Sequence, residues 1–386
     1  MTKTPAAVPV QEIPFSRPEY DDAEARAVAA VLATGWVSQG PKVAEFERRF
    51  ATLVGAREAV ATSSCTTALH LALIVAGVGP GDEVICPSYT FIATSNAVLY
   101  AQATPVFADI DRDTWNMDPE DVARRITPRT KAVIVVHQFG LPAPMAAYDQ
   151  MARKGVAIIE DAACVVGGTY DGRPVGSRGF TACFSFHPRK TISTGEGGML
   201  TTDDPDLAER ARQLRSFSAS VSDRARHEAR GIVFEEYREL GYNYRLTDIQ
   251  AAVGIEQLAK LDRLLAARRR IAARYDDAFS KIPGVRVPAT PAGVTHTYQT
   301  YGIRLPGRTA ADRDALIRAL VERGVSCRRG IAPVHLEPLY VARFGPNTLA
   351  ASEEVSDTSL LLPMFASLSD TDQTRVISAV TELLVR

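Results

Sequence analysis

Ile158-Ile159-Glu160-Asp161 decides the fold class, because a short run of bulky apolar residues ends there in two acids. Similar runs recur between residues 59 and 202, separated by stretches with helical spacing. Several are apolar throughout, as in strands that are buried on both faces of a sheet. Strands that alternate with helices predict an α/β domain with a mostly parallel sheet flanked by helices. The expected strands are Val84–Cys86, Val106–Asp109, Ala132–Val136, Val156–Glu160, Cys183–Phe186 and Met199–Thr201.

A smaller α+β domain is expected after this region. Thr247 and Gln250 have the spacing of a capping box, and an apolar helical face continues from them to about Ala278. The later elements expected are a strand at Gln299–Leu305 and helices at Ala310–Arg323 and Ser369–Leu384. The predicted parts are a flexible tail at residues 1–12, a large α/β domain at 13–250 and a small α+β domain at 251–386. The polar stretch at residues 216–239 is interpreted as a mobile or interface loop.

The composition disfavours several classes of protein. The chain has 386 residues, with 44 Lys and Arg against 45 Asp and Glu, and this balance disfavours a nucleic-acid-binding protein. No apolar run is long enough to span a bilayer, and residues 1–12 lack the apolar core of a secretory signal, so no membrane association is expected. Five scattered cysteines without Cys-x-x-Cys spacing favour reduced thiols in the cytoplasm over disulfides or a metal site.

Polar side chains gather where the expected strands end, which is the edge at which α/β sheets bind ligands. Pyridoxal phosphate needs a lysine for a Schiff base and a carboxylate that keeps its ring nitrogen protonated. It also needs hydroxyl and N–H groups at a helix N-terminus for its phosphate, and an apolar face for its ring. The residues that fill these roles are, in the same order, Lys190, Asp161, Thr66 and Thr67 with Ser185, and Phe91.

Each of these residues also has an ordinary structural explanation. An aspartate after a strand is commonly a helix cap or a turn residue. A lysine in a loop is almost always a solvated charge. Thr66 and Thr67 suit the start of any helix, and Phe91 suits a core. Only the combination of these residues points to the cofactor.

Motifs along nearly the whole chain carry a family resemblance. They include Ile13-Pro14-Phe15-Ser16, Gly35-Trp36-Val37-Ser38-Gln39-Gly40-Pro41, Gly79-Pro80-Gly81-Asp82-Glu83-Val84-Ile85, Pro105-Val106-Phe107-Ala108-Asp109-Ile110-Asp111, Ile126-Thr127-Pro128-Arg129-Thr130-Lys131-Ala132, Glu160-Asp161-Ala162-Ala163, Gly195-Glu196-Gly197-Gly198 and Gly241-Tyr242-Asn243-Tyr244-Arg245-Leu246. With these motifs in collinear order, the chain resembles the DegT-type pyridoxal-phosphate-dependent aminotransferases, most of which act on nucleotide-linked keto-sugars. The resemblance implies fold type I, with a large cofactor-binding domain and a smaller C-terminal α+β domain.

The resemblance also implies roles for single residues. Lys190 forms the Schiff base and later moves the proton between substrate and cofactor, while Asp161 pairs with the ring nitrogen and Phe91 lies against the ring face. Members of the family are homodimers with shared active sites, so Asn243 or Arg245 is expected to reach the phosphate in the partner subunit. The phosphate-binding positions match Thr66, Thr67 and Ser185.

Two departures from the family pattern bear on the site. Cys164 stands where many members carry Gln or Glu close to a ring oxygen of the cofactor, and a thiol is a weak hydrogen-bonding group. The loop that often reads His-Tyr-Pro contains Arg328-Arg329 instead, and two guanidinium groups suit a phosphate or a carboxylate. The candidate substrate contacts are Trp36, Tyr89, His187, Arg328 and Arg329.

The prediction is therefore a pyridoxal-phosphate-dependent aminotransferase. Its expected donor is L-glutamate or a similar amino acid, and its expected acceptor is a nucleotide-linked keto-sugar, in a ping-pong cycle. One alternative acceptor is a cyclitol or another cyclic ketone, because the substrate loops depart from the sugar pattern. Dehydration of a deoxysugar is disfavoured, because those relatives replace the lysine with histidine and this chain keeps Lys190. A non-catalytic regulator that binds the cofactor or a metabolite is the alternative from another class.

Overall fold

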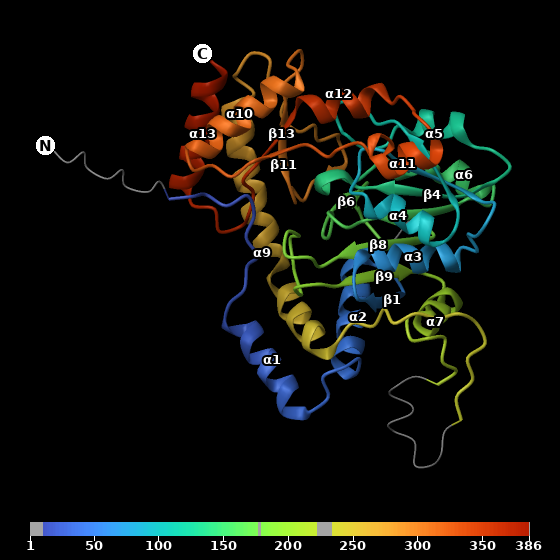
Figure 1. Ribbon diagram of the computed structural model, residues 1–386. Helices are drawn as coiled ribbons and strands as arrows, with labels where there is room; N and C mark the ends of the chain where they lie inside the picture. Colours follow the sequence, from blue (N-terminus) through green and yellow to red (C-terminus); the bar gives the residue numbers. More distant parts are fainter. Residues whose placement is uncertain (1–10, 177–178, 222–233, 386) are drawn as a thin grey trace, which may run out of the picture.

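The centre of the molecule is a seven-stranded sheet with the strand order β1-β9-β8-β5-β4-β2-β3 (Figure 1). The computed structural model describes residues 11–176, 179–221 and 234–385. The strands from β8 to β3 are parallel to one another, whereas β9 is antiparallel to both of its neighbours. The prediction of a mostly parallel sheet is confirmed. The strands are β1 (Glu58–Thr62), β2 (Glu83–Pro87), β3 (Thr104–Ala108), β4 (Thr130–Val136), β5 (Ala157–Asp161), β8 (Thr181–Ser185) and β9 (Gly198–Thr202).

Helices cover both faces of this sheet, as the uninterrupted apolar strands require. In β4, Ala132 and Ile134 pack on one side with α3 and α4, whereas Val133 and Val135 pack on the other side near Tyr148 and Met151. The helices of the first face are α3 (Cys65–Val75), α4 (Ala93–Tyr100) and α7 (Pro205–Leu214). Those of the second face are α2 (Pro41–Val54), α5 (Pro119–Arg125), α6 (Asp149–Arg153) and the first part of α9 (Asp248–Phe279).

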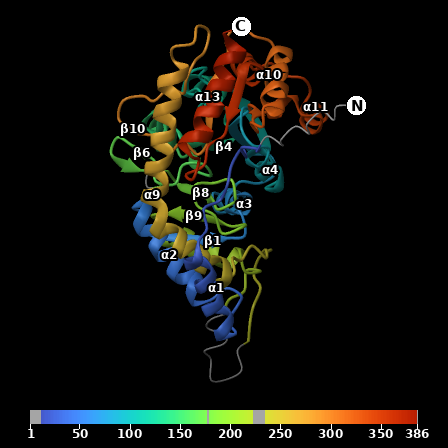
Figure 2. The same cartoon turned by 90° about the vertical axis from the view of Figure 1, so that its left-hand side faces the viewer.

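A second core forms around an antiparallel sheet of order β11-β13-β12. Its apolar residues come from the second half of α9 and from the C-terminal helices, together with Ile13. Figure 2 shows α9 running from this unit to the helices α1 (Asp22–Thr34) and α2, both of which pack against it. The other elements here are β11 (Tyr301–Arg304), α10 (Ala310–Glu322), β12 (Arg328–Arg329), α11 (Pro338–Phe344), α12 (Ala350–Thr358), β13 (Ser359–Leu362) and α13 (Asp370–Leu384).

The remaining elements are short. The two-residue strands β6 (Thr169–Tyr170), β7 (Arg173–Pro174) and β10 (Val294–Thr295) form a third sheet. The 3-10 helices are η1 (Gln138–Gly140), η2 (Met145–Tyr148) and η3 (Val334–Leu336).

Several local expectations are confirmed. The capping box of Thr247 and Gln250 begins α9, and the expected helices at Ala310–Arg323 and Ser369–Leu384 are α10 and α13. Most of the predicted N-terminal tail and residues 222–233 of the predicted loop lie outside the described residues. The domain boundary at residue 250 stays a prediction, because α9 contributes side chains to both cores.

Candidate active site

Three strands and one helix meet at the carboxyl edge of the sheet. In the register of the sheet, Gly198 at the start of β9 lies between Ser185, which ends β8, and Thr62, which ends β1. Helix α3 begins directly after β1, and its N-terminus packs against Gly198 so closely that a Cβ there would lie 2.4 Å from the carbonyl carbon of Ser64. The glycine therefore permits the close approach that brings Ser185 next to the start of α3.

The N-terminus of α3 is arranged to receive an anion. The Ser64 hydroxyl accepts a hydrogen bond from the Thr67 N–H at 3.2 Å, and the Thr67 hydroxyl accepts one from the Ser64 N–H at 3.1 Å. Thr66 and Thr67 are half-buried on the first turn. The N–H groups of a first turn lack partners within the helix and carry a partial positive charge, so this edge suits a phosphate.

Asp161 ends β5 at the same edge and is only 6% exposed. Its carboxylate accepts hydrogen bonds from the Thr94 hydroxyl at 2.8 Å and from the Ala163 N–H at 3.2 Å. Burial raises the pKa of Asp161, although these two hydrogen bonds and the charge of Lys190 act in the opposite direction. A buried carboxylate bonded to neutral donors is stabilised by a cationic partner, and a protonated ring nitrogen would supply one.

Lys190 points into the same cluster. Its Nζ donates to the Sγ of Cys164 at 3.2 Å. Burial lowers the pKa of Lys190, but the sulfur of Cys164 and the carboxylate of Asp161 outweigh this effect, and the net direction is upward. Cys65 also approaches Asp161, with 4.0 Å between Sγ and Oδ1. The structure thus brings Lys190, Asp161 and Cys164 together, as the sequence predicts.

The loop after β2 carries two aromatic candidates with different surroundings. Phe91 is 72% exposed and offers a free ring face. Tyr89 is fully buried, and its hydroxyl accepts a hydrogen bond from the Ile331 N–H at 3.3 Å and lies 3.2 Å from the Ser359 hydroxyl. Tyr89 therefore ties the loop that carries Phe91 to the segment that follows β12.

His187 and the arginine pair lie around the lysine loop. The Nδ1 of His187 accepts a hydrogen bond from the Arg189 N–H at 3.2 Å, and burial lowers the pKa of His187. Arg328 and Arg329 form β12 and are both exposed. The guanidinium of Arg328 lies over the ring of Phe15, 5.1 Å from its centroid.

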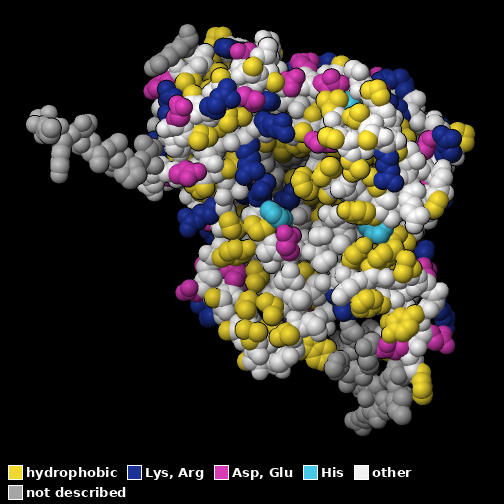
Figure 3. All heavy atoms as spheres, viewed as in Figure 1, with side chains coloured by type: hydrophobic (Ala, Val, Ile, Leu, Met, Phe, Trp, Pro, Cys, Tyr) yellow, Lys and Arg dark blue, Asp and Glu magenta, His cyan; other side chains and the backbone are white. Residues whose placement is uncertain are grey.

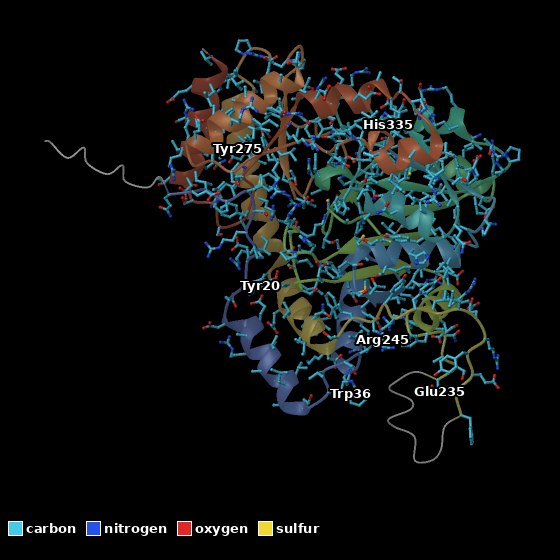
Figure 4. All side chains as sticks on the ribbon, in the orientation of Figure 1. Tyr20, Trp36, Glu235, Arg245, Tyr275 and His335 are labelled. Carbon is cyan, nitrogen blue, oxygen red and sulfur yellow. The ribbon has the colours of Figure 1, made fainter. Side chains whose placement is uncertain are left out.

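The other candidates lie in the lower part of the molecule, away from α10 and α13. Figure 4 places Trp36 in the turn between α1 and α2, and Arg245 below the sheet. The Trp36 indole N–H donates to the Gln39 carbonyl at 3.0 Å. Arg245 lies over Phe217 at 5.0 Å, and Asn243 forms a β-bridge with Ser216.

Two polar groups near the site belong to buried networks. The sequence does not single out Thr94, which donates to the Asp161 carboxylate. The Thr94 hydroxyl also lies 2.9 Å from the hydroxyl of Thr90, four residues earlier. His137 is fully buried, 3.0 Å from Glu160, and its Nδ1 accepts the Ala143 N–H at 2.9 Å. His137 is therefore a satisfied core histidine.

These residues fit pyridoxal phosphate. Lys190 would anchor it, Asp161 would face its ring nitrogen, Phe91 would cover its ring, and the first turn of α3 with Ser185 would hold its phosphate. When bound, the cofactor supplies an aldehyde and an electron-poor ring. The amine of Lys190 would hold and move a proton beside that ring.

Comparison with known proteins gives the family. A model of the DegT/DnrJ/EryC1/StrS aminotransferase family matches residues 18–381. The chain belongs to this family. It is 40% identical over 381 residues to the spore coat polysaccharide biosynthesis protein SpsC of Bacillus subtilis, with 96% of this chain and 97% of that protein covered.

Solved structures of similar proteins agree with this family membership. The aminotransferase TlmJ of Streptoalloteichus hindustanus is 38% identical with a TM-score of 0.89, over 97% of this chain and 99% of that one. The putative sugar aminotransferase Spr1654 of Streptococcus pneumoniae, in its PLP form, is 29% identical with a TM-score of 0.91, over 97% and 99% of the two chains.

The family membership confirms three predictions, which are the enzyme class, the fold type and the cofactor. The chain is an aminotransferase of fold type I, and enzymes of its family depend on pyridoxal phosphate.

Within the described residues, no helix has the length and apolar character needed to cross a membrane. The same residues contain no group of three His, Cys, Asp or Glu side chains placed to hold a metal ion.

Proposed function

We propose that this aminotransferase moves an amino group from L-glutamate, or a similar donor, to a nucleotide-linked keto-sugar in the cytoplasm. The observation that carries the proposal is the contact of Lys190 with Cys164 beside the buried carboxylate of Asp161. This cluster holds an amine and a carboxylate at one edge of the sheet, as amino-group transfer with pyridoxal phosphate requires. The names of SpsC and Spr1654, a polysaccharide biosynthesis protein and a putative sugar aminotransferase, favour a sugar acceptor.

The lysine and the aspartate have separable tasks in this proposal. Lys190 binds the cofactor covalently and carries the proton to and from the substrate carbon. Asp161 keeps the ring nitrogen protonated, and the Thr94 hydroxyl orients the carboxylate. Cys164 contacts Lys190 through sulfur. A weaker hydrogen-bonding group thus stands at a position where many members of the family carry an amide or a carboxyl.

The active form in this proposal is a homodimer with shared sites. The segment that carries Asn243 and Arg245 is flanked by exposed apolar side chains, which a partner subunit would cover. Asn243 or Arg245 then reaches the cofactor phosphate of the other subunit, and Trp36 approaches its substrate. The exposed apolar residues are Phe217, Phe234, Tyr237 and Leu240.

The acceptor is tested by spectroscopy. The enzyme is first loaded with pyridoxal phosphate, and L-glutamate is added until its yellow absorbance band disappears. Nucleotide-linked keto-sugars, free keto-sugars and cyclitol ketones are then added separately. Return of the band with a nucleotide-linked sugar alone supports the proposal, and return only with a cyclitol ketone shows that a cyclic ketone is the acceptor.

A further inference from the structure

A buried network of hydrogen bonds joins α12 and η3 to the segment between β2 and α4. Its outermost member is Glu353 on α12, whose carboxylate accepts from the Leu349 N–H at 2.9 Å and lies 3.2 Å from the Nε2 of His335. The Nδ1 of His335 lies 2.6 Å from the Ser88 hydroxyl, and the His335 N–H donates to the same hydroxyl at 3.1 Å. Figure 4 shows His335 in the region of α11 and α12. Ser88 therefore meets both a ring nitrogen and the backbone N–H of one residue.

The carboxylate of Glu353 decides where the protons of this network lie. An ionised carboxylate only accepts hydrogen bonds, so the Nε2 of His335 carries the proton that faces Glu353. The Nδ1 is then the accepting nitrogen, and the Ser88 hydroxyl donates to it. Because His335 and Ser88 are both buried, water does not replace either contact. Figure 3 shows hydrophobic side chains at the surface over α11, and Leu336 and Leu339 are among the exposed apolar residues of this stretch.

On its other side, Ser88 is linked to the edge of the sheet that would hold the cofactor. The Ser88 carbonyl accepts from the Thr90 N–H at 3.0 Å and from the Val334 N–H at 2.9 Å. The Thr94 hydroxyl gives its proton to Asp161 at 2.8 Å, so the Thr90 hydroxyl is the donor in the 2.9 Å contact between the two threonines. Ser88 thus connects His335 to the side chain that orients the Asp161 carboxylate.

We infer that Ser88 and His335 are positioning residues for the pyridoxal phosphate site. Only residues 88–92 separate β2 from α4, so a shift of Ser88 would move Phe91 and the start of α4 together. The contact of Ser88 with His335 holds this segment where Phe91 covers the ring and Thr94 reaches Asp161. The inference rests on the proposed function, because it needs Asp161 to face the ring nitrogen of the cofactor.

The surroundings of Phe91 favour a positioning role over packing alone. Its neighbours Tyr89, Thr90 and Thr94 are buried and hydrogen-bonded, whereas the Phe91 ring is 72% exposed. An exposed phenyl ring costs free energy in water, and a ring on a fixed backbone is available to stack on a planar ligand. The same short segment therefore holds an aromatic face and the hydroxyl that bonds Asp161.

The test compares two variants of His335, each of which keeps one of its side-chain contacts. His335→Asn places an oxygen near the position of Nδ1, so it still accepts from the Ser88 hydroxyl and loses Glu353. His335→Gln reaches Glu353 and leaves the Ser88 hydroxyl without its acceptor. The affinity for pyridoxal phosphate is measured by titration, and the circular dichroism of the yellow band shows how firmly the ring is held. His335→Gln and Ser88→Ala should weaken cofactor binding about tenfold and reduce the dichroism, whereas His335→Asn should stay within about threefold of the wild type.

Unfolding temperatures of the same cofactor-free variants separate positioning from a general loss of stability. Tyr275→Phe is the matched control, because it removes a buried hydrogen bond to the Pro363 carbonyl in the second core. Figure 4 places Tyr275 well away from His335. The control should lower the unfolding temperature and leave cofactor affinity unchanged. If Ser88→Ala does not fold, Ser88→Cys takes its place, since it keeps the shape and weakens the same hydrogen bonds.

Two results would overturn the inference. One is wild-type affinity and dichroism in both Ser88→Ala and His335→Gln. The other is a loss of cofactor affinity in both His335 variants that follows their loss of stability, which would show a structural role only. The proposed function is judged separately, by titration of the wild type with L-glutamate and other amino donors. A yellow band that no donor bleaches would refute the donor reaction, and cofactor binding by the variants would still decide the roles of Ser88 and His335.

Discussion

Replacement of Asp161 by asparagine tests the electrostatic basis of the site. The carboxylate is 6% exposed and bonds the Thr94 hydroxyl and the Ala163 N–H. Asparagine has nearly the same shape but keeps one oxygen instead of two. That oxygen can still accept from the Ala163 N–H, and the NH2 group can donate to the Thr94 hydroxyl, so the main change is the loss of the negative charge. Losing one member of a buried charge pair costs about 3–5 kcal/mol. The donor half-reaction should therefore slow by about 10²- to 10⁴-fold.

The assay is stopped-flow absorbance of the loaded enzyme after mixing with L-glutamate, at saturating pyridoxal phosphate. Thr94→Val should slow the same step by less, because it removes one hydrogen bond to the carboxylate and leaves the charge in place. Asp262→Asn on the exposed face of α9 serves as the control. An Asp161→Asn rate within tenfold of the wild type would refute the assigned role of the carboxylate.

Asp161→Asn should slow the reaction, but it should not lower the stability of the cofactor-free protein. Burial raises the folded-state pKa of Asp161, so the ionised carboxylate destabilises the fold at neutral pH, and this penalty diminishes as the pH falls through the raised pKa. Cofactor-free Asp161→Asn should therefore unfold at the wild-type temperature or above it. The stabilisation gained on adding pyridoxal phosphate should be smaller in the variant than in the wild type.

Three further predictions concern the dimer, the packing and the effect of acid. If Arg245 acts in the partner's site, mixing the inactive variants Lys190→Ala and Arg245→Ala should restore about one quarter of wild-type activity. Half of the dimers are then heterodimers, and each heterodimer holds one intact site. No recovery after verified subunit exchange would contradict the shared site. Gly198→Ala should lower the free energy of unfolding by about 1–3 kcal/mol and weaken cofactor binding, because its Cβ would collide with the backbone at the start of α3. Denaturant unfolding measures this, with Gly79→Ala as a control whose Cβ meets no neighbouring atom. Equal stability of the two variants would be inconsistent with the packing at Gly198. A threonine hydroxyl, and then an arginine, lower the pKa of Glu83. The wild type should therefore be more stable than Glu83→Gln by a full margin above pH 4.5, and this margin should shrink as the pH falls through the lowered pKa. Unfolding curves at several pH values measure the margin, and a constant difference would argue against the effect.

The sequence predicts the parallel part of the sheet well because its strands are apolar throughout. Ala132–Val136 and Val156–Glu160 coincide with β4 and β5 to within two residues. Strand β1 was not expected, since Glu58-Ala59-Val60-Ala61-Thr62 is rich in alanine, which has a low strand propensity. The antiparallel direction of β9 depends on pairing with β1 and β8, which residue patterns within one strand do not contain.

Some residues of the site can likewise be predicted from the sequence, whereas others become evident only in the structure. Asp161, Ser185 and Lys190 were found because each stands at or just after the end of a buried strand. Thr94 was missed because its contact with Asp161 depends on how α4 packs near β5, and a threonine inside a helix gives no signal of such a contact.

The central claim is that Lys190 anchors pyridoxal phosphate in a site that accepts amino groups. The most direct measurement is the absorbance spectrum of the purified protein with pyridoxal phosphate, before and after L-glutamate, for the wild type and Lys190→Ala. The wild type should show a yellow band that glutamate bleaches, and Lys190→Ala should show no such bound band. A bleachable band in Lys190→Ala, or no band in the wild type, would contradict it.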